Sequence, residues 1–148
     1  MPQATTYAMI MLAAGIGIPI LAALNAALGQ HIGSALAAGV VIFVVGFLIS
    51  LTVVILSGDL PHLAQITTAP KHLFLAGGFM AFYAITITFV APKFGIGNAV
   101  FFVLLGQLIS AAIIDQFGLF GAQISPLSLT RAAGIAVMAA GVWLTQIA

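Results

Sequence analysis

The chain is apolar almost without a break from residue 7 to residue 147. A helix needs about 20 apolar residues to cross the hydrocarbon core of a bilayer. Charge, proline and glycine divide the chain into five apolar segments of about this length. The sequence therefore predicts a membrane protein that crosses the bilayer several times. Only five of the 148 residues carry a formal charge, namely Asp59, Lys71, Lys93, Asp115 and Arg131.

We expect an all-α fold, a single transmembrane domain of five helices over residues 1–148. Backbone exposed to lipid must form its hydrogen bonds within its own segment, and these segments are too long to be the strands of a membrane barrel. With 64% hydrophobic and 3% charged residues, the chain leaves no part over for a soluble domain. The expected spans are residues 7–28, 34–56, 73–91, 99–114 and 132–147.

The composition argues against several classes of function. A net charge of +1 makes no basic patch, so we expect no nucleic-acid partner. The two acids lie at helix ends, and no serine has a histidine and an acid within plausible reach, so we do not expect an enzyme. The histidines belong to turns on two sides of the membrane, which argues against a metal site. No cofactor is expected.

Polar side chains inside the spans are the candidates for function, because they cost free energy in lipid unless they have partners. Asn25 lies in the last third of the first span, and Tyr83 lies on a stripe of the third. Gln107 and Ser110 lie near the middle of the fourth. Each of these side chains could instead bridge two helices or pack in the core. We predict Asn25, Tyr83, Gln107 and Ser110 as contacts for a small solute.

Asp115 and Arg131 form a separate candidate pair. Asp115 ends the fourth span and Arg131 precedes the fifth, so adjacent antiparallel helices would place them near each other. Asp115 has two open interpretations, a proton site or a structural salt bridge to Arg131, and we favour the structural role.

Several motifs resemble those of a known family. The stretch GIGNAVFFVLLGQLISAAIIDQFGLFG, followed by LTRAAGIAVMAAGV, is similar to the C-terminal half of the YdcZ-like family. That family comprises five-span members of the drug/metabolite transporter superfamily. The resemblance covers essentially the whole chain and implies an inner-membrane transporter. It also implies antiparallel two-domain assemblies, because the family occurs as single, paired and fused genes.

The resemblance has two informative departures. Asp115 stands where the ten-span exporters of the superfamily usually have a glutamate. The four-span multidrug transporters carry a glutamate inside the first helix, whereas the first span here has only Asn25. Cation antiport driven by such a carboxylate is therefore in doubt.

The sequence thus favours a secondary transporter, an exporter or exchanger that works by alternating access as an antiparallel homodimer in a bacterial inner membrane. Its partners would be the lipid bilayer, a second copy and a small solute. No charged group is expected at the midplane, so the solute would be neutral, zwitterionic or lipophilic. Two alternatives stay open, namely a passive channel and a membrane assembly partner that transports nothing.

The first testable prediction concerns orientation. Five spans would place the N-terminus on the side of Lys71 and Arg131, opposite Lys93, and a difference of one cation barely biases insertion. We expect reporter fusions at the C-terminus to register both locations. Adding two lysines to the Gln30–His31 turn should drive most molecules to an outside N-terminus. A wild type with one uniform orientation would contradict dual insertion.

Overall fold

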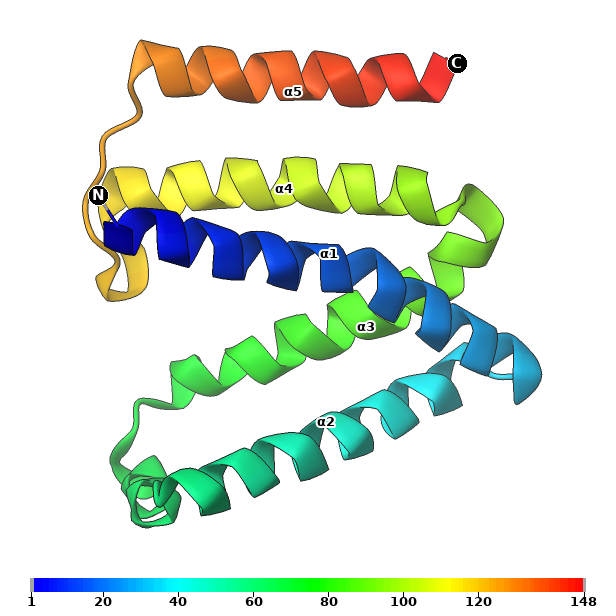
Figure 1. Cartoon of the computed structure of the whole chain (residues 1–148), viewed down its shortest axis with the longest axis vertical. Helices are drawn as coiled ribbons and strands as arrows, with labels where there is room; N and C mark the ends of the chain where they lie inside the picture. The colour runs from blue at the N-terminus through cyan, green and yellow to red at the C-terminus, as the bar shows by residue number, and fades with distance from the viewer. Residues whose placement is uncertain (1, 148) are drawn as a thin grey trace. The chain divides into compact units, whose positions relative to one another are not determined.

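The computed structural model describes residues 2–147, which are almost entirely helical and contain no strand (Figure 1). The prediction of an all-α fold is confirmed. Two 3₁₀ segments connect α2 to α3, and a third follows α4. The elements are α1 (Pro2–His31), α2 (Ala35–Ser57), η1 (Leu60–Thr68), η2 (Lys71–Phe74), α3 (Leu75–Phe94), α4 (Ile96–Phe117), η3 (Leu119–Gly121) and α5 (Leu129–Ile147).

Four helical segments among the described residues are long and apolar enough to cross a membrane. They are Gln3–His31, Ala35–Ser57, Lys71–Phe94 and Ile96–Phe117. The 19 residues of α5 would extend roughly 28 Å at the usual rise of an α-helix, which is close to the thickness of the hydrocarbon core. α5 also carries Arg131 in its first turn and Gln146 at its end. The fifth span is therefore plausible and stays a prediction.

The helices are longer than the predicted spans, and some connections are shorter. Residues 92–98 were expected to form a turn, but Gly95 alone separates α3 from α4. Its φ is 89°, a backbone conformation that residues with a Cβ atom rarely adopt. Glycine therefore permits this one-residue break. The two helices thus extend to the residues on either side of this glycine, Phe94 and Ile96.

The contacts within the chain define two compact units, Met1–Lys93 and Phe94–Ala148. We call them the N-terminal unit and the C-terminal unit. These units describe contacts within the chain and do not test the prediction of one transmembrane domain over residues 1–148, which stays a prediction.

The N-terminal unit is built on a tight turn between α1 and α2. Gly33 adopts a φ of 74° there. The Ser34 hydroxyl then caps α2 by accepting a hydrogen bond of 3.2 Å from the backbone N–H of Ala37. This turn brings the end of α1 against the beginning of α2, and the two helices pack against each other.

Small residues form most of the buried surface of this unit, as expected where helix backbones approach closely in lipid. Gly29 lies at one of the tightest approaches in the unit. A Cβ atom at this position would lie 3.2 Å from Cγ2 of Thr88 and 3.3 Å from Cα of Ala35. A Cβ atom at Gly39 on α2 would similarly lie 3.2 Å from Cγ1 of Ile85. The buried apolar residues of the unit are Ala22, Ala26, Ala38, Ala84, Ile87 and Ala91.

In the C-terminal unit, α4 and α5 pack against each other and run in opposite directions (Figure 1). Polar bonds join the two helices at both ends. Gln146, near the end of α5, donates a hydrogen bond of 3.0 Å to Asn98 at the beginning of α4. Arg131 and Asp115 form an ion pair at the opposite end. These two links hold the pair of helices in one register.

The close approach at Gly29 generates a prediction about stability. Gly29→Leu should destabilise the N-terminal unit by about 1–3 kcal/mol, because the added atoms overpack the contact with Thr88 and Ala35. Gly17→Leu is the matched control, since Gly17 lies on the same helix and a Cβ there meets no atom within 4 Å. Thermal unfolding in detergent measures both variants. Equal melting temperatures for the two would contradict the prediction.

Candidate functional site

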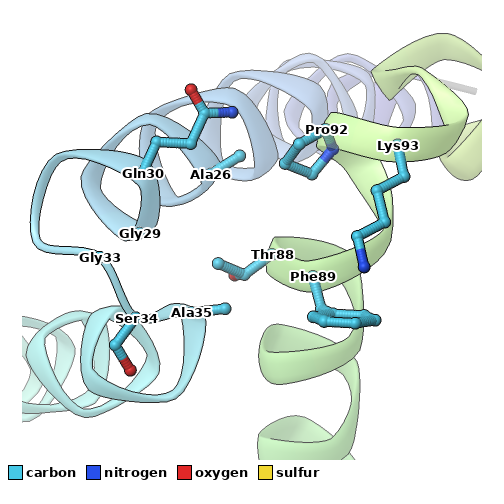
Figure 2. Close-up of a pocket in the computed structure, with 10 residues that line it drawn as sticks. All are labelled: Ala26, Gly29, Gln30, Gly33, Ser34, Ala35, Thr88, Phe89, Pro92 and Lys93. Carbon is cyan, nitrogen blue, oxygen red and sulfur yellow. The ribbon is translucent and has the colours of Figure 1, made fainter.

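A cavity of about 270 Å³ opens at one end of the N-terminal unit (Figure 2). Its walls come from the end of α1, the turn into α2 and the end of α3. Figure 2 shows Ala26 and Pro92 facing each other across it, with Thr88 between the helices. The lining is mostly apolar and comprises Ala26, Gly29, Gln30, Gly33, Ser34, Ala35, Thr88, Phe89, Pro92 and Lys93.

A hydrogen bond between α1 and α3 lies at the edge of this cavity. The side-chain amide of Asn25 donates to the hydroxyl of Thr88, which in turn donates to the carbonyl of Ala84 at 2.6 Å. Asn25 and Thr88 are only 4% and 2% exposed. Burial makes this chain of bonds important, because an unpaired amide inside a membrane costs several kcal/mol (~2–7). Asn25 therefore joins two helices.

Asn25 also borders a second cavity, which lies between α1 and α2 and has a volume of about 320 Å³. Its other lining residues are the apolar side chains of Leu21, Leu24, Leu28, Val41, Ile42 and Val45. Asn25 therefore has a structural hydrogen bond to Thr88. Its predicted contact with a solute stays a prediction. The sequence analysis did not identify Thr88, because its partner lies 63 residues away along the chain.

Lys93 lies at the rim of the first cavity. Its ammonium nitrogen is 3.6 Å from the centroid of the Phe89 ring, a cation–π contact between residues four positions apart on α3 (Figure 2). The i,i+4 spacing of Phe89 and Lys93 could have indicated this contact, had the predicted helix continued to Phe94. Pro92, between them, has no N–H to donate to the carbonyl of Thr88, so that acceptor lacks its usual helical bond.

Tyr83 carries a buried polar atom without a partner, unlike the other residues of the predicted site. Its hydroxyl oxygen on α3 is buried and has no hydrogen-bond partner among the described residues. Most buried polar groups in proteins have partners, and exceptions call for an explanation. A phenol can both donate and accept a hydrogen bond. The hydroxyl therefore keeps its hydrogen-bonding capacity unused, although Tyr83 lines neither of the two cavities described above.

Gln107 and Ser110 belong to the C-terminal unit, whereas Asn25 and Tyr83 belong to the N-terminal unit. Both Gln107 and Ser110 are exposed on α4, well inside its span. Contact of these polar groups with lipid costs free energy. The predicted contacts of Gln107 and Ser110 with a solute stay predictions.

Asp115 and Arg131 do come together. The guanidinium Nη2 of Arg131 donates to a carboxylate oxygen of Asp115 at 2.6 Å, and the two side chains are 35% and 33% exposed. The loop between the helices is fastened at the same place. The backbone N–H of Ser125 donates to the carbonyl of Asp115 at 2.9 Å, and that of Leu127 donates to the Gln116 side chain at 2.6 Å. The pair therefore lies where α4, the loop and α5 meet.

Residues 2–147 contain no group of three or more histidine, aspartate or glutamate side chains placed to hold a metal ion.

The ion pair generates the next prediction. If its role is structural, Asp115→Asn should lower stability by about 1 kcal/mol, the upper range for partly exposed pairs. The charge swap Asp115→Arg with Arg131→Asp should recover part of this loss. Asp59→Asn is the control, because the Asp59 carboxylate is exposed and its only described side-chain neighbours are Ser57, whose hydroxyl donates to it at 3.1 Å, and His62 at 3.6 Å. Thermal unfolding gives the stabilities.

A transport assay separates the two interpretations of Asp115. A proton site predicts that a stably folded Asp115→Asn loses uptake driven by a pH gradient but keeps counterflow exchange. We expect the structural outcome, in which coupling survives in any variant that folds. Loss of coupling without loss of stability would contradict this expectation.

Comparisons with known proteins place the chain in a family. A family model described as "Putative inner membrane exporter, YdcZ" matches residues 6–144. No curated protein and no solved structure matches the chain. The description points to a transporter rather than an enzyme, and it agrees with the apolar helices that can span a membrane. The predicted resemblance and the inner-membrane location are thereby confirmed, and the chain belongs to the YdcZ family of multi-pass inner-membrane proteins.

Proposed function

We propose that this protein is a secondary exporter or exchanger of small neutral, zwitterionic or lipophilic organic solutes. In this proposal it works as an antiparallel homodimer by alternating access. The family description supports the export of a solute in general terms. The solute class, the dimer and the mechanism are the parts we add.

The buried hydroxyl of Tyr83 is the observation that carries the proposal. It lies inside a span without a partner among the described residues. A solute that donates or accepts one hydrogen bond would satisfy it, and such a bond gains strength from the low dielectric of its surroundings. The same unit contains cavities of about 270 Å³ and 320 Å³ with mostly apolar linings; Tyr83 lines neither of them, so a solute would reach its buried hydroxyl only in a rearranged conformer. Volumes near 300 Å³ are at the lower end of those that hold small ligands.

The charge distribution supports the solute class. The spans that contain Asn25, Tyr83, Gln107 and Ser110 have no ionised side chain near their middle. A solute with a strong net charge would find no counter-charge there, and its desolvation would stay uncompensated. Neutral or internally balanced solutes avoid this cost.

Two features support a second copy. Gln107 and Ser110 are exposed on α4 at a depth where lipid is a poor partner, whereas a second protein chain or a hydrated cavity could satisfy them. The small difference in Lys and Arg between the two sides of the membrane would allow insertion in both orientations. Inverted pairs of this kind form substrate sites near the midplane, and alternating access then exchanges equivalent states.

Tyr83→Phe tests the proposal because it removes only the hydroxyl. The first step is a thermal-shift screen of the wild-type protein against neutral, zwitterionic and lipophilic metabolites. The best ligand is then measured by counterflow in proteoliposomes. We expect Tyr83→Phe to weaken ligand stabilisation and transport by roughly 5- to 10-fold, the equivalent of one neutral hydrogen bond. The ligand-free variant should melt at or above the wild-type temperature, because an unpaired buried group is gone.

Tyr7→Phe is the matched control, since Tyr7 is 64% exposed near the beginning of α1. It should leave transport and stability unchanged. A Tyr83→Phe variant with full ligand response and full transport would contradict the assignment of Tyr83. A wild type that shows flux without saturation or counterflow would contradict a transporter and favour a channel.

A further inference from the structure

The connection between α2 and α3 is ordered as a 3₁₀ helix of unusual length. η1 runs over the nine residues Leu60–Thr68, whereas 3₁₀ runs longer than three or four residues are uncommon. This helix has three residues per turn, so side chains three positions apart lie directly above one another. Leu60, Leu63 and Ile66 therefore form a single apolar ridge. Their exposed fractions are 49%, 50% and 55%.

The polar side chains of η1 form a different ridge. His62, Gln65 and Thr68 follow the same spacing of three, displaced from the apolar residues. The Thr68 hydroxyl donates to the carbonyl of Gln65 at 2.8 Å, and that of Thr67 donates to Ala64 at 3.1 Å. Both threonine hydroxyls thereby find acceptors within the segment itself. η1 is thus amphipathic, with its backbone largely satisfied by its own residues.

The neighbours of η1 fix its position relative to the bilayer. The span before it ends at Ser57, and the span after it begins at Lys71. η1 also packs against the end of α2. A segment tied so closely to two spans must lie at the membrane boundary. The only acid of this connection, Asp59, is balanced by Lys71, so no excess negative charge opposes contact with anionic headgroups.

We propose that η1 lies in the plane of the membrane interface. The ridge formed by Leu60, Leu63 and Ile66 inserts into the boundary between lipid headgroups and acyl chains. The ridge formed by His62, Gln65 and Thr68 faces the headgroups and water. The lipid surface is the occupant because the adjoining spans already extend this surface to both ends of η1. Interfacial helices of this kind bury their apolar face to a depth of roughly 5–10 Å.

Tryptophan fluorescence tests the proposal in the full-length protein. Trp143 is the only tryptophan of the chain, so Trp143→Phe provides a background without signal. Leu63→Trp then reports on the apolar ridge, and Gln65→Trp is the matched control on the polar ridge of the same segment. Ile66→Trp replaces Leu63→Trp if that variant does not fold. The proteins are reconstituted into phosphatidylcholine–phosphatidylglycerol vesicles, with bromine placed either near the headgroup end or near the methyl end of the acyl chains.

We expect Leu63→Trp to lose most of its emission to the shallow bromine and little to acrylamide in the water. Gln65→Trp should show the reverse. Equal acrylamide quenching of both variants would overturn the proposal, since the ridge would then lie in water. Protection of Leu63→Trp from both quenchers would also overturn it, since protein from this chain or a second copy would cover the ridge. Strong quenching of both variants by the deep bromine would show an embedded segment and would overturn it as well.

Discussion

The high cost of an unpaired polar group in lipid governs how this structure is organised. A membrane interior offers no water to satisfy such a group, so each polar side chain must find a partner in the protein or accept a penalty. Asn25 finds Thr88, and Asn98 finds Gln146. These bonds cross between helices in each unit, so the constraint that makes polar groups expensive also determines which helices lie together.

Close packing acts on the same contacts. Gly29 lies one helical turn beyond Asn25, and its missing side chain lets Thr88 approach α1. A larger residue would push α3 away and stretch the hydrogen bond between the two helices. Packing and hydrogen bonding are therefore coupled at this point rather than independent. Additive estimates of their energies would be unreliable here, as for other neighbouring residues that share a contact.

The features that the sequence predicted well are those that depend on neighbours along the chain. The approach of Asp115 to Arg131 follows from two adjacent helices and a short connection, and the ion pair is present in the structure. The bond between Asn25 and Thr88 depends on how α1 meets α3, which no local pattern specifies. The ridge of Leu60, Leu63 and Ile66 was missed for another reason. Its period of three belongs to a 3₁₀ helix, and it lies between the predicted spans 34–56 and 73–91, where no helix was predicted.

The bond to Thr88 changes how Asn25 should be regarded. An asparagine amide can make about four hydrogen bonds, two as donor and two as acceptor. Bridging two helices takes one of these, so a structural role and contact with a solute in the adjoining cavity are compatible. Replacement of Asn25 would remove both together, and lost transport would not reveal which one mattered. Tyr83 differs because its hydroxyl has no partner among the described residues. Removing that hydroxyl separates binding from folding, which makes Tyr83 the more informative residue for function.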